Sequence, residues 1–144
     1  ALWEQRGWRD LPRIEVDELG KPFFPDYPDT HFSLSHTAGA AAAVLADTPV
    51  GVDIERVRPV SVRAMERIAG VRTEAAFFRS WVRREARVKR TGSGIVTMMR
   101  TEAPLNRGEF YYEVDAFHGY AAGVAAGQPE PPQPVHRLML DQLL

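Results

Sequence analysis

The fold is decided by two stretches, Val50-Gly51-Val52-Asp53-Ile54-Glu55 and Trp81-Val82-Arg83-Arg84-Glu85-Ala86-Arg87-Val88-Lys89. In the first stretch branched apolar residues alternate with Gly51, Asp53 and Glu55, and this period of two predicts a strand with one buried face. Because alternate side chains of a strand project from the same face, we expect Asp53 and Glu55 to lie close enough together to share a ligand.

The second stretch predicts a helix that carries an unusual carboxylate. At about 100° per residue, Glu85 falls on an apolar stripe of the helix, between Trp81 and Phe78. The stripe consists of Phe77, Phe78, Trp81 and Val88. A carboxylate there is costly unless a cation or strong donors satisfy it. Together with the two strand carboxylates, Glu85 indicates a hard divalent ion held by oxygen ligands, which is typical of Mg²⁺.

Simpler interpretations of the same carboxylates stay open at this point. Asp53 and Glu55 could form an ordinary solvated strand face. Glu85 could instead pair with Lys89 or Arg84 on its own helix.

The composition narrows the class of protein. At 144 residues the chain is long enough for one domain with a sizeable core. Its net charge of −1 gives no basic field that would favour nucleic acid. The absence of cysteine excludes disulfides and thiolate zinc sites. No apolar run reaches the roughly 18 residues that span a membrane, and the first residues do not resemble a signal peptide, so we expect a soluble, cytoplasmic protein.

Local patterns predict an α+β fold, an antiparallel sheet packed against one long helix. Strands are expected at 31–35, 40–46, 50–55, 95–99, 110–114 and 119–126, and helices at 62–69 and 74–90. The strand at 40–46 is expected to pair with 50–55 across a turn. Four leucines of the tail (Leu138, Leu140, Leu143 and Leu144) are expected to dock back onto the domain.

Four motifs in this order resemble those of a known enzyme family. They are Gly20-Lys21-Pro22, then Phe32-Ser33-Leu34-Ser35-His36-Thr37, then Val50–Glu55, then Trp81–Lys89 running into Gly92-Ser93-Gly94. The set is similar to the 4′-phosphopantetheinyl transferases of the surfactin-synthetase-activating (Sfp) type. The resemblance implies a pseudo-dimer of two similar halves, with residues 1–49 as a shortened first half and 50–144 as the second half, which carries the metal site.

The resemblance also implies an activity and its site. Such enzymes transfer 4′-phosphopantetheine from coenzyme A to a serine of an acyl or peptidyl carrier protein and release 3′,5′-ADP. The implied Mg²⁺ ligands are Asp53, Glu55 and Glu85, with Asp53, Glu85 and Lys89 as the catalytic set. Glu85, or a water activated by the metal, is the expected base for the carrier serine.

Further residues are implied as contacts of coenzyme A. Lys89 is expected to bind phosphate, Ser35 and His36 to contact coenzyme A phosphates, and Lys21 to contact a peripheral phosphate or the surroundings of the adenine. Arg84 stands where the family usually has lysine; arginine can bind phosphate in a fork but cannot carry a proton.

Two alternatives follow from the same residues. The short first half and Arg84 suggest a degenerate member that binds coenzyme A or a carrier protein without turnover. The arginines opposite the apolar stripe (Arg79, Arg83, Arg87 and Arg90) are interpreted as a solvated helix face that could attract an acidic carrier protein. A basic helix that binds nucleic acid is the weaker reading of that face.

Overall fold

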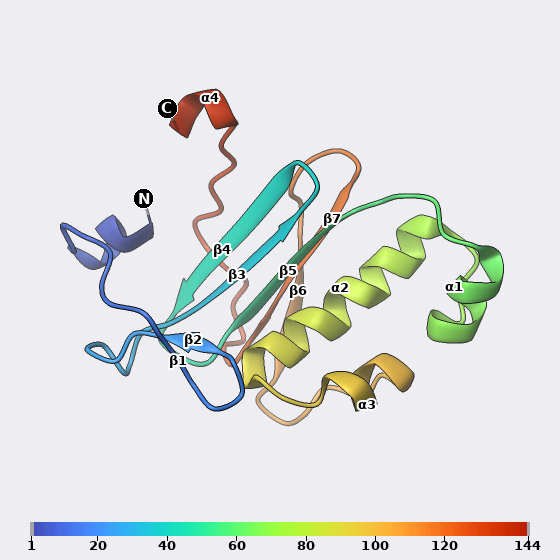
Figure 1. Cartoon of the computed structure of the whole chain (residues 1–144), viewed down its shortest axis with the longest axis horizontal. Coiled ribbons are helices and arrows are strands. Elements are labelled where there is room, and N and C mark those ends of the chain that lie inside the picture. Colours follow the sequence, from blue (N-terminus) through green and yellow to red (C-terminus); the bar gives the residue numbers. More distant parts are fainter. Residues whose placement is uncertain (1, 144) are drawn as a thin grey trace.

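The computed structural model describes residues 2–143, except for the side chains of Leu2, Trp3, Leu140 and Leu143. Its strands are β1 (Glu15–Val16), β2 (Pro22–Phe23), β3 (His31–Thr37), β4 (Ala40–Ala46), β5 (Gly51–Arg56), β6 (Phe110–Val114) and β7 (Tyr120–Ala126). Its helices are the 3₁₀ turn η1 (Leu2–Arg6), α1 (Val62–Ala69), α2 (Glu74–Thr91), α3 (Ile95–Arg100) and α4 (Leu140–Leu143). Figure 1 shows α2 lying along the strands, with α1 at one end of the molecule and both termini near the other.

The strands form antiparallel pairs, so the predicted α+β class is confirmed in its coarse form. β3 pairs with β4, and β5, β7 and β6 form a second sheet in that order. The predicted pairing of 40–46 with 50–55 is wrong, because β4 turns back at Gly39, which has a φ of 81°, and pairs with β3. β5 pairs instead with the distant β7, where Asp53 lies opposite Gly123. The predicted boundary between two halves at residue 49 falls in the loop between β4 and β5, and the division into halves stays a prediction.

Hydroxyl side chains join the two sheets. The backbone N–H groups of Val52, Ile54 and Arg56 donate to Ser33 Oγ, Ser35 Oγ and Thr37 Oγ1 at 3.1, 3.2 and 3.3 Å. Hydroxyls at every second residue of β3 thus give β5 the partners that a neighbouring strand's carbonyls would otherwise supply. This ladder holds β3 beside β5 and brings Ser35 to Asp53.

The long helix is confirmed at nearly its predicted length. The side chain of Thr73 caps its first turn by accepting from Ala76 N, and Gly92 ends it in the left-handed conformation. A Cβ on Gly51 would stand 2.0 Å from the carbonyl oxygen of Ala86. Glycine at this position therefore lets α2 lie directly on β5.

Two buried clusters form the core. Val50, Val52, Val124 and Ala126 pack on the sheet face that β4 covers. Met65, Phe77 and Phe78 pack where α1 meets α2. Among the helices that the structure describes, none is long and apolar enough to cross a membrane.

Two sequence predictions about the far side of α2 are wrong. Residues 95–99 form the helix α3 rather than a strand, and contacts with α2 explain why: Arg84 Nη1 donates to the Met99 carbonyl at 3.1 Å. The arginine face is also only partly solvated: Arg79 is exposed, but α3 and the loop after it cover Arg87, which is only 3% exposed. Local preference and a helical-wheel pattern are overridden by this tertiary packing.

The tail does not dock as predicted at Leu138, whose side chain is exposed. The side chains of Leu140, Leu143 and Leu144 lie outside the described residues.

Candidate active site

Asp53 is the centre of the site. Its Oδ1 accepts from the hydroxyl of Ser35 at 2.8 Å and from the ammonium of Lys89 at 2.9 Å. Its side chain is only 5% exposed. The second oxygen, Oδ2, is buried and accepts no hydrogen bond from any described residue. A buried carboxylate oxygen without a donor is costly, and such an oxygen is free to take a cation.

The surroundings of Asp53 raise the pKa of its carboxyl. Burial raises the pKa of the carboxyl, and nearby Glu55 adds to the rise, while the charge and hydrogen bond of Lys89 and the hydroxyl of Ser35 oppose it. The net pKa stays above its ordinary value. Lys89 and Ser35 therefore do not fully offset the effect of burial on this carboxyl.

Glu85 faces this site from α2. Burial raises its pKa, Asp53 and Glu55 add to the rise, and Lys89 opposes it. Among the described residues Glu85 has no ion pair, so its predicted alternative pairing with Lys89 or Arg84 is not what forms: Lys89 pairs with Asp53. Lys89 is thus ion-paired with the carboxylate from β5 and acts on the carboxylate from α2 only through its charge.

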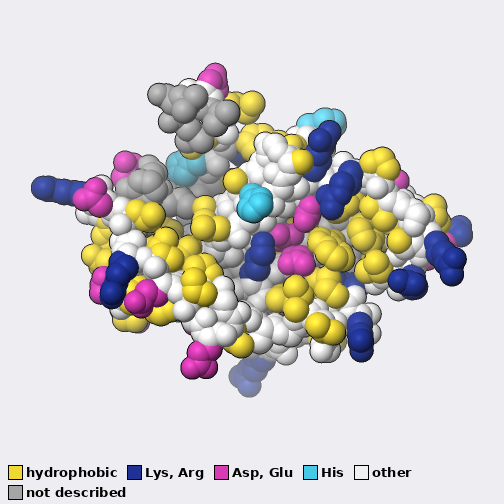
Figure 2. All heavy atoms as spheres, in the orientation of Figure 1, with side chains coloured by type: hydrophobic (Ala, Val, Ile, Leu, Met, Phe, Trp, Pro, Cys, Tyr) yellow, Lys and Arg dark blue, Asp and Glu magenta, His cyan; other side chains and the backbone are white. Residues whose placement is uncertain are grey.

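Glu55 completes the acidic group but is turned to other partners. Its Oε2 accepts from Arg58 Nη1 at 3.0 Å and from the hydroxyl of Thr37 at 3.3 Å. Figure 2 shows acidic side chains gathered near the middle of this face, beside a basic one. Within residues 2–143, no three His, Asp or Glu side chains stand in an arrangement that could hold a metal ion. The three predicted ligands are electrostatic neighbours rather than a formed coordination sphere.

Lys21, Ser35 and His36 have different surroundings. The ammonium of Lys21 donates to the carbonyls of Val50, at 3.1 Å, and of Lys89, so it links the start of β5 to the last turn of α2. The hydroxyl of Ser35 is used by Asp53 and Ile54. His36 is exposed on β3. Their predicted contacts with coenzyme A stay predictions.

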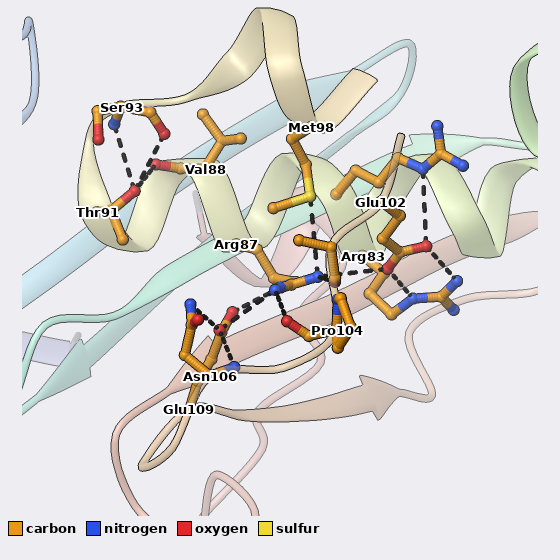
Figure 3. Close-up of polar contacts among 12 residues, drawn as sticks. Arg83, Arg87, Val88, Thr91, Ser93, Met98, Glu102, Pro104, Asn106 and Glu109 are labelled. Carbon is orange, nitrogen blue, oxygen red and sulfur yellow. Dashed lines mark hydrogen bonds and ion pairs between the residues drawn. The ribbon is translucent and has the colours of Figure 1, made fainter. Parts of the chain in front are cut away.

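Arg84 does not pair with a carboxylate of the candidate site; its ion pair is with Glu102, at 3.6 Å. It is buried, and its Nη1 donates to the carbonyls of Ile68 at 3.0 Å and Met99 at 3.1 Å. Beside it, Arg83 pairs with Glu102 and Arg87 pairs with Glu109 (Figure 3). The structure gives Arg84 a scaffold role, and its predicted contact with coenzyme A stays untested.

Three residues beside the site are not predicted by the sequence. Thr37 and Arg58 donate hydrogen bonds to Glu55. The hydroxyl of Tyr111 lies against Gly123, only 1.9 Å from the position that a Cβ would take on that glycine. Burial raises the pKa of Tyr111, with contributions from charges that include Asp53. The sequence indicates only Thr37, which alternates with Ser35 and therefore lies on the same face of the strand. The contacts of Arg58 and Tyr111 depend on packing and strand register, which the sequence pattern does not give.

Comparisons with known proteins agree with the motifs. The chain is 27% identical over 161 residues to 4′-phosphopantetheinyl transferase Sfp of Bacillus subtilis, covering 92% of this chain and 70% of that protein. It is 36% identical over 94 residues to 4′-phosphopantetheinyl transferase psf-1 of Bacillus pumilus, covering 57% of this chain and 40% of that protein. It is 32% identical over 115 residues to 4′-phosphopantetheinyl transferase AcpT of Salmonella typhi, covering 69% of this chain and 60% of that protein. No family model matches the chain.

The fold and the site define an α+β enzyme whose acidic centre is shared between a strand and a helix. More narrowly, the similarity to these proteins supports the 4′-phosphopantetheinyl transferase superfamily and, within it, the Sfp type.

Proposed function

We propose that this protein transfers 4′-phosphopantetheine from coenzyme A to a serine of an acyl or peptidyl carrier protein. The observation that carries the proposal is the arrangement around Asp53, where carboxylates and Lys89 from two motifs of the family meet across β5 and α2. The names of the related transferases support the same reaction.

The residue types at this site suit Mg²⁺ as the partner of this reaction, although the described side chains do not form a coordination sphere. All three candidate ligands (Asp53, Glu55 and Glu85) offer the hard carboxylate oxygens that Mg²⁺ prefers. The buried Oδ2 of Asp53, which has no donor among the described residues, is available to an ion. When bound, Mg²⁺ would neutralise negative charge on the diphosphate of coenzyme A.

The chain's own side chains can carry the proton transfer. Since burial and neighbouring carboxylates raise the pKa of Glu85, it is a better proton acceptor than an exposed glutamate. In the proposed step the carrier serine oxygen bonds to the phosphorus that bears pantetheine, and the serine proton passes to Glu85. The bond from that phosphorus to the bridging oxygen breaks, and the electron pair leaves with 3′,5′-ADP. Lys89 would then donate to a diphosphate oxygen.

Intact-mass spectrometry tests this proposal. An apo carrier protein is incubated with the chain, coenzyme A and Mg²⁺, beside a sample containing EDTA and one containing Asp53→Ala. We expect one added phosphopantetheine in the complete mixture and none with EDTA or the variant. Transfer by Asp53→Ala, or transfer in EDTA, would contradict the assigned site.

A further inference from the structure

The carboxylate of Glu55 is already bound by a cation of its own chain. Its Oε2 accepts from Arg58 Nη1 at 3.0 Å and from the hydroxyl of Thr37 at 3.3 Å. The side chain of Glu55 is 20% exposed, so water screens this ion pair only in part. In the metal-free protein, the charge of Glu55 is therefore balanced by Arg58.

Two further contacts fix Arg58 in this position. Its guanidinium carbon lies 4.7 Å from the centroid of the Phe78 ring, and its Nη1 also donates to the carbonyl of Arg56 at 3.0 Å. Phe78 is buried in the cluster where α1 meets α2, so the ring is a rigid support. A guanidinium over an aromatic face is attracted by the ring. The pair with Glu55 is thus better ordered than an isolated surface ion pair, although Arg58 itself is half-exposed.

The three carboxylates of the candidate site differ in their cations. Asp53 pairs with Lys89 at 2.9 Å, and Glu55 pairs with Arg58. Glu85 has no ion pair among the described residues. A carboxylate oxygen bound by a guanidinium cannot also contact a metal ion closely, because the two cations repel each other. The contact with Arg58 therefore opposes the convergence of Glu55 with the other two carboxylates on one ion.

A hollow beside Glu55 leaves room for an exchange of cations. It has a volume of about 390 Å³, and Thr37, Glu55, Arg56 and Arg58 are among its lining residues. A divalent ion such as Mg²⁺ keeps several of its waters when it binds carboxylates, so it needs space of this kind to approach. The side chain of Arg58 can turn into the same space once it releases Glu55.

We propose that Arg58 competes with the metal ion for Glu55, so that it occupies this carboxylate in the metal-free protein and must leave before Glu55 can act as a ligand. The proposal rests on the proposed function, since Glu55 is a ligand only if this site binds a divalent ion. Arg58 is then a positioning residue that sets the metal affinity without touching the ion. The apparent affinity is lowered by the fraction of molecules in which Glu55 is still occupied.

A manganese titration of the metal-free protein, without coenzyme A, tests the role of Arg58. Mn²⁺ accepts the same carboxylate oxygens as Mg²⁺, and electron paramagnetic resonance counts the ion that remains free. We expect Arg58→Gln to bind Mn²⁺ roughly threefold to tenfold more tightly than wild type, which corresponds to the loss of one ion pair supported by an aromatic ring. Arg58→Lys keeps the charge but loses the planar fork, so its affinity should fall between the two.

Arg56→Gln is the matched control. Arg56 is exposed and lines the same hollow, and no described residue forms an ion pair with its side chain. The variant removes a positive charge near Glu55 but leaves the pair with Arg58 in place, so it should bind Mn²⁺ nearly as wild type does. Equal tightening in Arg56→Gln and Arg58→Gln would reveal a general effect of charge and overturn the proposal. Unchanged or weaker binding by Arg58→Gln would overturn it as well.

The outcomes separate this proposal from the proposed function. If Arg58→Gln gains no affinity for Mn²⁺ while EDTA still prevents carrier modification, the role of Arg58 falls and the transfer reaction with its metal stands. If neither wild type nor Arg58→Gln binds Mn²⁺, the role of Arg58 falls whatever the effect of EDTA. Carrier modification that persists in EDTA would then overturn the assigned metal site too.

Discussion

At the scale of single residues, the site holds partly buried carboxylates whose charged forms are destabilised. Asp53 and Glu85 both have a raised pKa, and the nearby lysine, Lys89, is ion-paired with Asp53 alone. A carboxyl whose pKa is higher in the folded protein binds protons more readily there than in the unfolded chain. In the absence of metal, the stability of the fold is therefore expected to fall as pH rises above the ordinary values of 3.8 and 4.5, up to the raised ones.

Neutralising Glu85 should stabilise the metal-free protein while removing its activity. In Glu85→Gln the charge repulsion with Asp53 disappears, so we expect the melting temperature at pH 7 to rise by a few degrees. The gain should vanish near pH 4, where the wild-type glutamate is protonated, and carrier modification should be lost. Differential scanning calorimetry at the two pH values measures this. Glu18→Gln, at an exposed position, is the control; an unchanged or lower melting temperature for Glu85→Gln at pH 7 contradicts the account.

Much of this centre could be predicted because periodicity fixes which face a side chain occupies. The alternation of β5 put Asp53 and Glu55 on one face, and helical spacing put Glu85 and Lys89 one turn apart. The partners of Glu55 could not be predicted, because Thr37 and Arg58 reach it only through the packing of β3 beside β5. The same holds for Tyr111, whose approach to Asp53 depends on the register that pairs Gly123 with Asp53.

At the scale of elements, α2 is held between a sheet and a covering of charged contacts. Arg87 donates to both carboxylate oxygens of Glu109 and to the carbonyls of Ala103 and Pro104, all under the loop that follows α3. The helical pattern predicts a solvated face because helical spacing shows which residues share a face, but not which later segment packs against it. Which segment covers the face depends on the order and length of the elements that follow α2. The course of the loop after α3 depends in turn on the buried ion pairs of this face.

Breaking this pair should be costly. Arg87→Met leaves Glu109 buried without its main donor, and removal of one partner from a buried pair costs about 3–5 kcal/mol. We expect urea unfolding to show a loss of that size, with part recovered in the double variant Arg87→Met, Glu109→Gln. Arg79→Met, at an exposed position of the same helix, should change little. Equal stability of Arg87→Met and wild type would show that the buried pair does not hold the loop.

The acid response of the same pair has the opposite sign to that of the site. Burial alone would raise the pKa of Glu109, but hydrogen bonds from Arg87 and Asn106 outweigh it and lower the net pKa. The pair therefore contributes stability above the ordinary glutamate value of 4.5, and that contribution is lost as pH falls through the lowered pKa.

The close contact between α2 and β5 depends on glycine at position 51, because no side chain would fit there. In Gly51→Ala the new Cβ would stand 2.0 Å from the Ala86 carbonyl and 2.4 Å from Arg90 N, so α2 must move off the strand that carries Asp53. We expect a loss of about 3 kcal/mol or more of unfolding free energy. Gly108→Ala meets no atom within 4 Å and should cost only its positive φ, about 1 kcal/mol. Urea unfolding of the two variants compares the cost of a steric clash with the cost of backbone strain. Equal losses of unfolding free energy would contradict the close approach of α2 to β5.

At the scale of the whole molecule, the two sheets are joined by side chains where a continuous sheet would use backbone. The ladder of Ser33, Ser35 and Thr37 means that hydroxyls on β3 determine where β5 and its carboxylates lie relative to the earlier part of the chain.

In Ser33→Ala the buried N–H of Val52 loses its acceptor, which should cost about 1–3 kcal/mol. Amide exchange at Val52 should accelerate more than at Ala125 on β7, since the other side of β5 keeps its pairing. Leu34→Ala, on the exposed face of the same strand, is the matched control and should leave both amides as they are. If Ser33→Ala also leaves Val52 protected, the two sheets are held together by packing rather than by the hydroxyl ladder, and the position of Asp53 beside Ser35 must then be explained by the core alone.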